Sequence, residues 1–374
     1  MKSRIYICDT TLRDGEQTPG VAFSVAQKIT IARLLDLAGV DEIEAGTPVC
    51  GGEEAEGIRE IVKLPLKAKV TGWCRMKRND LDEAIDTGLN TVTIAVPSSD
   101  LHIAKKLQRD RGWLIDELRG VLRYGALLGL DFNVAFEDAS RADRAFLLEL
   151  AEEAMWLGAK RVRLSDTVGQ LDPFTTFELF EAFRRIDTQL EFHGHNDFGL
   201  ATANSLAAAR GGATHLSVTT LGIGERAGNA ALEEVAGALE CIHGVETGVS
   251  LSALTPLFDA VSNYSGRAIG PGKSIAGEAI FTHESGIHVD GILKDPATYE
   301  PFSPELIGAE RKILLGKHSG GASLRHKLKD KGIFLLFEEA KSALPELKKL
   351  VALQKAGDVE ASLSRLEEYA MELG

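Results

Sequence analysis

Strand-like and helical segments alternate along the first 220 or so residues, and this repeat constrains the fold more than any other feature of the chain. In five segments an amphipathic helix ends at a glycine, and a short apolar, β-branched run followed by polar residues comes next. They read LAGVDEIEAG, DTGLNTVTIAV, LLGLDFNVAFED, WLGAKRVRLSDTVG and ARGGATHLSVTTLG. With the less regular YICDTTLRD, LKAKVTGWC and LEFHGHND, they predict eight strands between about residues 4 and 220. Eight evenly repeated units favour a (β/α)₈ TIM barrel, an α/β fold with a parallel sheet, over a doubly wound open sheet.

The pattern changes after about residue 250, where the chain becomes rich in glycine and irregular. Residues 332–374 then read as charged amphipathic helices, including FEEAKSALPELKKL and VEASLSRLEEYAMEL, which we expect to pack against the protein or a second subunit. We therefore expect a catalytic barrel in residues 1–257 and a smaller, mostly helical C-terminal module in residues 258–374.

Net charge limits which binding partners are expected, and cysteine usage indicates the cellular compartment. A net charge of −13 argues against a general binder of nucleic acid or anionic membranes, which needs an excess of Lys and Arg, so small molecules are the expected partners. No apolar run approaches the ~20 residues that span a bilayer, and the chain passes from Met1 almost directly into a strand, without a signal peptide. Cysteines 8, 50, 74 and 241 are scattered, which fits a reducing compartment, and we expect a cytoplasmic protein.

The stretch EFHGHNDFGL places two histidines at the end of the seventh predicted strand. Residues i and i+2 of a strand project to one face, so His193 and His195 can converge on one point. With a carboxylate from another strand, for which Asp14 is our choice, they predict a mixed N/O metal site. Such ligands suit Mg²⁺, Mn²⁺, Fe²⁺, Co²⁺ or Zn²⁺. The structural alternative is a pair of hydrogen-bonded histidines at a strand end.

Charged residues gather in TLRDGEQ, after the first predicted strand. One interpretation is a polar turn made by Asp14 and Gly15. The other is that Arg13, beside a metal, polarises a carbonyl oxygen and stabilises an enolate or alkoxide.

Two further segments carry polar groups. The loop LGIGERAGNAAL follows the eighth strand but misses the spacing of a dinucleotide fingerprint, and its Asn229 can face the metal. The segment THESGIHVDGILKDPATYEPF holds His283, His288 and Tyr299, which we expect to be solvated unless the segment folds over a barrel mouth as a lid.

Four motifs together resemble the DRE-TIM metallolyase family, specifically its acyl-CoA condensing branch of 2-isopropylmalate, citramalate and homocitrate synthases. They are DTTLRDGEQTPG, HGHNDFGLATANSLAA, GIGERAGNA and FTHESGIHVDGILK, and the resemblance runs over nearly the whole chain. It implies condensation of acetyl-CoA with a 2-oxo acid bound to a divalent metal ion, then thioester hydrolysis. A homodimer is also implied.

The resemblance also implies roles for individual residues. Asp14, His193 and His195 are the implied metal ligands, with Asn229 as a nearby candidate. Arg13 is implied to bind the 2-oxo group, and Gln17 and Thr167 to line the 2-oxo acid site. Glu137, His288 and Tyr299 match positions implicated in acid/base work.

The segments EIEAGTP, WCR, EDASRAD and GIHVDG are most similar to homocitrate synthases that serve nitrogenase FeMo-cofactor biosynthesis. The implied acceptor is then 2-oxoglutarate. Lysine-pathway relatives hold its distal carboxylate with an Arg where this chain has Asn133. We therefore predict that Arg75, on the third strand, supplies that cation, a surface salt bridge being the alternative.

Other functions stay open at this point. Within the branch, 2-isopropylmalate or citramalate synthesis would use 2-oxoisovalerate or pyruvate as acceptor. Related barrels instead cleave 3-hydroxy-3-methylglutaryl-CoA or 4-hydroxy-2-oxo acids, although the C-terminal module favours condensation. A metal-binding protein without activity is the non-enzymatic alternative, against which the intact Arg13, Asp14, His193 and His195 argue.

Overall fold

The computed structural model describes residues 4–352 of the 374-residue chain. It divides into two compact units, the first running to Ile269 and including Ser274–Ala276, the second comprising Gly270–Lys273 and the residues from Gly277 onward. The domain boundary that we predict at 257/258 falls within helix α9 (Thr255–Ser265), which belongs to the first unit. No helix within residues 4–352 has both the length and the apolar character needed to cross a membrane.

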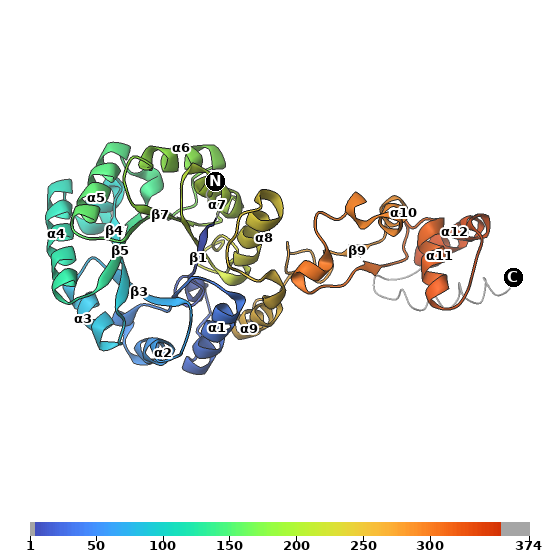
Figure 1. Cartoon of the computed structure of the whole chain (residues 1–374), viewed down its shortest axis with the longest axis horizontal. Coiled ribbons are helices and arrows are strands. Elements are labelled where there is room, and N and C mark those ends of the chain that lie inside the picture. Colours follow the sequence, from blue (N-terminus) through green and yellow to red (C-terminus); the bar gives the residue numbers. More distant parts are fainter. Residues whose placement is uncertain (1–3, 353–374) are drawn as a thin grey trace. The chain divides into compact units, whose positions relative to one another are not determined.

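In the first unit, eight parallel strands of the described chain close into a barrel in sequence order, with β1 paired to β8 (Figure 1). The strands are β1 (Tyr6–Asp9), β2 (Glu42–Glu44), β3 (Lys69–Arg75), β4 (Thr91–Pro97), β5 (Asp131–Glu137), β6 (Arg161–Asp166), β7 (Gln189–Gly194) and β8 (His215–Val218). The predicted TIM barrel is confirmed.

Helices cover the outside of this barrel (Figure 1). They are α1 (Val25–Ala38), α2 (Gly52–Val62), α3 (Arg78–Asp86), α4 (Arg111–Leu127), α5 (Arg144–Trp156), α6 (Pro173–Phe183), α7 (Ala201–Gly211), α8 (Leu232–His243) and α9. Their ends follow local chemistry: Ser24 forms a capping box with Gln27 at the start of α1, and Gly39 ends that helix with a positive φ of 88°.

The strands alternate between an apolar outer face and a polar inner face. In β6, RVRLSD, the apolar Val162 and Leu164 alternate with Arg163 and Ser165, which line a cavity inside the barrel. On the neighbouring strand Phe192 packs edge-on against Phe180 of α6, with ring centroids 5.7 Å apart. The barrel is therefore held from outside by apolar packing against helices, while its interior carries buried charge.

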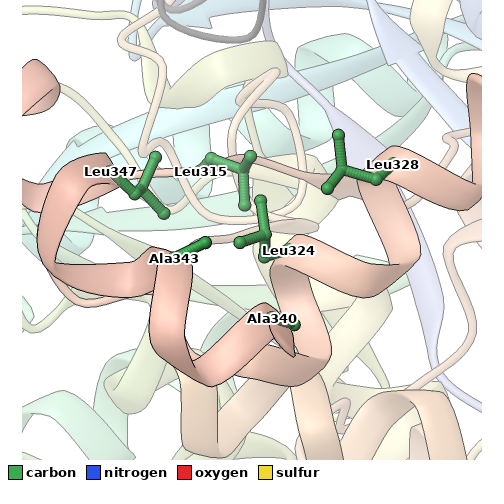
Figure 2. Close-up of a cluster of buried hydrophobic side chains, with 6 residues drawn as sticks. All are labelled: Leu315, Leu324, Leu328, Ala340, Ala343 and Leu347. Atoms are coloured by element: carbon green, nitrogen blue, oxygen red, sulfur yellow. The ribbon is translucent and has the colours of Figure 1, made fainter. Parts of the chain in front are cut away.

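The second unit contains a two-stranded parallel sheet and three α-helices within its described residues. They are β9 (Thr282–His283), α10 (Gly286–Lys294), β10 (Lys312–Ile313), α11 (Gly321–Asp330) and α12 (Phe337–Ala352). Figure 2 shows the core between α11 and α12, made by Leu315, Leu324, Leu328, Ala340, Ala343 and Leu347. The helix predicted in FEEAKSALPELKKL is confirmed as α12, whereas VEASLSRLEEYAMEL lies outside the described residues.

Candidate active site and metal centre

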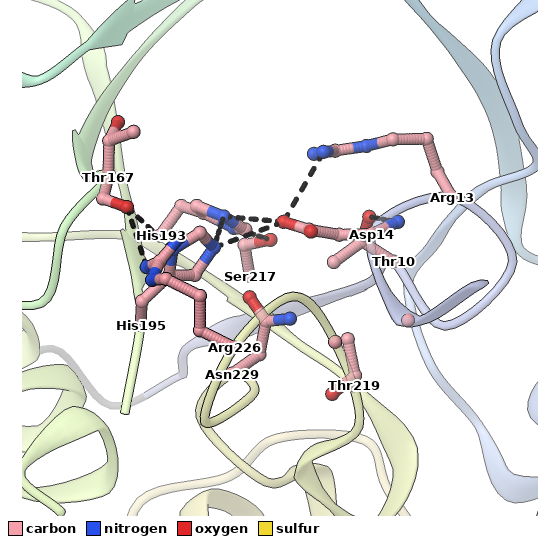
Figure 3. Close-up of polar contacts among 12 residues, drawn as sticks. Thr10, Arg13, Asp14, Thr167, His193, His195, Ser217, Thr219, Arg226 and Asn229 are labelled. Atoms are coloured by element: carbon pink, nitrogen blue, oxygen red, sulfur yellow. Dashed lines mark hydrogen bonds and ion pairs between the residues drawn. The ribbon is translucent and has the colours of Figure 1, made fainter. Parts of the chain in front are cut away.

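Three ligand-type atoms converge at the mouth of the barrel. Oδ2 of Asp14 lies 2.9 Å from Nε2 of His193 and 3.3 Å from Nε2 of His195, and the two Nε2 atoms are 3.2 Å apart. Figure 3 shows the carboxylate and the two imidazoles pointing at one another, from the loop after β1 and from the end of β7. The side chains that the sequence predicts as metal ligands are thus brought together, and they form a group of the kind that holds a metal ion.

Neighbouring polar groups fix the orientation of both imidazoles. Nδ1 of His195 lies 2.8 Å from the carbonyl oxygen of Thr167 and 2.8 Å from Nη2 of Arg226, and Nδ1 of His193 lies 2.9 Å from Oγ of Ser217. When each Nδ1 carries the proton, each Nε2 presents its lone pair toward Asp14. Hydrogen bonding at the remote nitrogen is the usual support for a metal-ligating histidine.

The electrostatics of the triad also fit a cation. Burial alone would raise the pKa of Asp14, but Arg13 and the two histidines hold it well below its usual value. Burial lowers the pKa of His193, which favours the neutral, ligating form. Two lone pairs and a carboxylate at these distances repel one another unless a cation or proton lies between them.

Asn229 supplies a further oxygen. It pairs with His195 across an antiparallel bridge, and its buried Oδ1 has no hydrogen-bond partner among the described residues. Its amide nitrogen donates to the carbonyl oxygen of Ile223 at 3.1 Å. A Cβ on Gly224 would lie 2.1 Å from that nitrogen, so the glycine is needed for Asn229 to occupy this place. An unpartnered oxygen, a carboxylate and two imidazoles are a donor set that fits a divalent metal ion.

A cavity of about 210 Å³ opens beside the triad. Its lining includes Arg13, Gln17, Glu137 and Thr167, all predicted from the sequence as substrate-binding or catalytic residues. Nη1 of Arg13 lies 3.3 Å from Oδ2 of Asp14, so the guanidinium is next to the ligand group. Glu137 pairs with Nζ of Lys106 at 2.7 Å.

The remaining predicted site residues are Arg75 of the barrel unit and His288 and Tyr299 of the second unit. Arg75 is not among the described residues that line the cavity: its guanidinium makes two hydrogen bonds to Asp80, of 2.8 and 2.9 Å, and its side chain is 48% exposed. This arrangement is the surface salt bridge that the sequence left as the alternative. In the second unit, His288 stacks on Tyr299 with ring centroids 4.3 Å apart. The roles of all three residues stay predictions.

Sequence reasoning missed a buried ion-pair ladder inside the barrel. It is made of Arg13, Glu44, Arg163, Glu191, Arg161 and Glu42. Oε2 of Glu44 accepts from Arg13 at 2.5 Å and Oε1 of Glu44 accepts from Arg163 at 3.0 Å. The available signal was the pair of charges at alternate positions of two predicted strands, EIE and RVR, which sends like residues to one face.

Comparison with known proteins gives two family matches. Residues 4–261 match the family model described as HMGL-like. Residues 275–355 match the model described as the homocitrate synthase post-HMGL domain-like family.

Curated relatives carry three different synthase names. A 2-isopropylmalate synthase 2 of Caldanaerobacter subterraneus subsp. tengcongensis is 47% identical over 92% of this chain and 90% of its own length. A homocitrate synthase of Frankia alni is 47% identical over 88% of this chain and 94% of its own. A protein of Methanopyrus kandleri named as an (R)-citramalate synthase is 45% identical over 92% of this chain and 69% of its own.

Solved structures show the same fold. The HMG-CoA lyase of Bacillus subtilis matches with a TM-score of 0.65 and 20% identity, over 72% of this chain and 96% of that one. An HMG-CoA lyase of Acinetobacter baumannii, solved with coenzyme A and 3-methylmalate, matches with a TM-score of 0.62 and 22% identity, over 71% and 92% of the two chains.

Proposed function

The chain belongs to the HMGL-like family and, within it, to the branch that condenses acetyl-CoA with 2-oxo acids, and on this premise we propose that it is a homocitrate synthase. The proposed reaction joins acetyl-CoA to 2-oxoglutarate and hydrolyses the thioester, releasing homocitrate and CoA. The observation that supports this acceptor is the polar lining of the cavity next to the triad.

That lining suits a dicarboxylate. Apart from Trp73, Ala95 and Ala135, the lining residues are charged, imidazole, hydroxyl-bearing or amide side chains, and none of those described is Val, Leu, Ile or Phe. The branched alkyl group of 2-oxoisovalerate would be buried against charged groups there, which costs free energy, whereas a second carboxylate finds hydrogen-bond donors.

The triad and Arg13 would bind the reacting end of the acceptor. A divalent ion held by Asp14, His193 and His195 would supply Lewis-acid polarisation of the keto group. Glu44 accepts from Nε of Arg13 at 2.5 Å and so fixes the guanidinium beside the triad, where its free donors stabilise the alkoxide that forms during addition. Gln17 and Thr167 line the same cavity and would orient the acceptor's first carboxylate.

Enolate formation requires a base for the methyl group of acetyl-CoA. We assign acid/base work to His288, with Tyr299 and Glu137 assisting, as the sequence predicts. If His288 is the base, His288→Ala lowers kcat by at least about 100-fold and leaves the Kd for 2-oxoglutarate unchanged. An unchanged kcat would remove His288 from this role.

The deciding assay follows release of the CoA thiol by the purified protein with acetyl-CoA and Mg²⁺ or Mn²⁺. The acceptors are 2-oxoglutarate, 2-oxoisovalerate and pyruvate, and Asp14→Asn is the inactive control. A higher kcat/KM for 2-oxoglutarate supports homocitrate synthesis. A higher value for a monocarboxylate would instead make the protein a 2-isopropylmalate or citramalate synthase, the second candidates, which relatives at 47% and 45% identity favour.

A further inference from the structure

Arg163 is a buried arginine with one hydrogen-bonding nitrogen left over. Its side chain is 1% exposed, yet it contributes to the lining of the cavity. Nε donates to Oε1 of Glu191 at 2.8 Å and Nη1 donates to Oε1 of Glu44 at 3.0 Å. Nη2 is buried and has no hydrogen-bond partner among the described residues. A buried charged donor without a partner is costly, and inside a substrate cavity it indicates a ligand atom that completes it.

We propose that Nη2 of Arg163 receives the distal carboxylate of the acceptor and thereby selects 2-oxoglutarate over monocarboxylic 2-oxo acids. This inference rests on the function proposed above and names the residue that sets its substrate class.

The strand register places Arg163 deeper in the barrel than the triad, at a distance from it that an acceptor can span. Ser165 of β6 is the neighbour of His193 in register, and Arg163 is the neighbour of Glu191, two residues earlier. Two residues of a strand advance about 6.6 Å. Arg163 therefore starts one layer below the metal ligand, a separation comparable with the length of a five-carbon diacid. An acceptor whose keto end lies at the triad can direct its second carboxylate toward this layer.

Small side chains leave space beside Arg163. Ala135 of β5 is its neighbour in register, and Ala95 of β4 is the neighbour of Ala135. Both alanines line the cavity. Asn133 lies two residues before Ala135 and so faces the same side one layer deeper.

The ion-pair ladder fixes the guanidinium of Arg163 in place before the acceptor binds. Burial alone would raise the pKa of Glu44, but Arg13 and Arg163 lower it to about 2, so this carboxylate stays ionised. Glu191, between Arg161 and Arg163, also has a lowered pKa. Two ionised partners fix the guanidinium plane from two sides, so little entropy is lost when a carboxylate binds the third nitrogen. Arg75 lacks this preorganisation toward the cavity because both of its Asp80-bound nitrogens are engaged at the surface.

The test compares Arg163→Lys with the wild type. Lysine keeps the positive charge but has no planar fork, so it cannot hold two buried carboxylates and bind a third in the same geometry. We expect KM for 2-oxoglutarate to rise at least about tenfold, with kcat changed much less and the slow turnover of pyruvate unaffected. Arg119→Lys is the matched control, because Arg119 makes a two-bond ion pair with Glu153 outside the cavity. Thermal melting establishes that each variant is folded.

The outcomes separate this inference from the proposed function. If the wild type prefers 2-oxoglutarate but KM for 2-oxoglutarate is unchanged in Arg163→Lys, the inference is wrong and the proposed function stands. The same holds if KM rises in Arg75→Lys and not in Arg163→Lys. Wild-type preference for a monocarboxylate would overturn both. If Arg163→Lys does not fold, a crystal structure of the wild type with Mg²⁺ and 2-oxoglutarate decides: a distal carboxylate on Nη2 of Arg163 supports the inference, and any other location rejects it.

Discussion

Glu44→Gln tests whether the buried ion-pair ladder stabilises the barrel. Glu44 is 1% exposed and bridges Arg13 and Arg163, while its Oε2 also accepts from Oγ1 of Thr10 at 2.8 Å. Glutamine keeps the shape, and its oxygen can still accept from Thr10 and Arg13, but the variant removes the charge and places an amide nitrogen, a donor, against the guanidinium of Arg163. The two guanidinium groups then lose the anion between them.

The magnitude follows from linkage. The pKa of Glu44 falls from 4.5 to about 2 on folding. A shift of about 2.5 units corresponds to about 3 kcal/mol, similar to the 3–5 kcal/mol typical of breaking a buried ion pair. Because the folded pKa lies below the unfolded one, this stability is fully present above pH 4.5 and is lost as pH falls through 2. We therefore expect a deficit of about 3 kcal/mol at pH 7 that shrinks to about 1 kcal/mol at pH 3.

Urea unfolding followed by tryptophan fluorescence measures this deficit. Trp73, Trp113 and Trp156 all belong to the barrel unit, so the signal reports on that unit. Glu56→Gln is the control, because Glu56 is exposed and has no ion pair within the described structure. A loss below about 1 kcal/mol at pH 7, or a loss that stays constant down to pH 3, would refute the reasoning.

Three further predictions concern other parts of the chain. Mn²⁺ at about 100 times its Kd should stabilise the wild type by about 2.7 kcal/mol, and Asp14→Asn should abolish this gain in a thermal shift assay. Burial raises the pKa of Asp9 to about 7, so between pH 3.8 and 7 the folded chain keeps a proton that the unfolded chain loses. The contribution of this protonated group to stability is fully present below pH 3.8 and is lost as pH rises through 7. In urea unfolding, the stability of Asp9→Asn relative to the wild type should therefore be about 3 kcal/mol higher at pH 8 than at pH 5. Leu324→Ala removes a fully buried side chain from the core of the second unit and should lower the free energy of unfolding of that unit by about 2–5 kcal/mol. Hydrogen exchange should show reduced protection in α11 and α12, while the unfolding transition followed by tryptophan fluorescence stays unchanged.

The barrel could be predicted because its information is local. Each strand and each helix of the repeat carries its own periodicity, and the closing glycines mark the boundaries. The convergence of Asp14 with His193 and His195 also followed, since strand ends of a parallel barrel meet at one rim. A period-2 pattern tells which face of the strand a residue occupies, and its place at the carboxyl end of the strand tells at which rim it lies.

The same pattern cannot tell which partner a side chain meets across the barrel. Arg163 and Glu44 are 119 residues apart, and nothing local in RVRLSD identifies that carboxylate. A local contact accounts for the absence of Arg75 from the described lining of the cavity. Asp80, five residues later, accepts from both the backbone nitrogen and the guanidinium of Arg75, so the start of α3 binds this side chain at the surface.

Arg13 joins the metal centre to the ion-pair ladder. Its guanidinium lies 3.3 Å from the ligand Asp14 on one side and 2.5 Å from Glu44 on the other. A cation held by the triad would weaken the ion pair between Asp14 and Arg13 and would leave the guanidinium of Arg13 to Glu44 and the acceptor oxygens. Glu44 is in turn shared with Arg163, so one carboxylate connects the two groups that we propose to bind the two ends of a diacid. On this proposal the charges that stabilise the barrel also place its substrate, and exchanging one of them for an apolar side chain should change both stability and substrate binding.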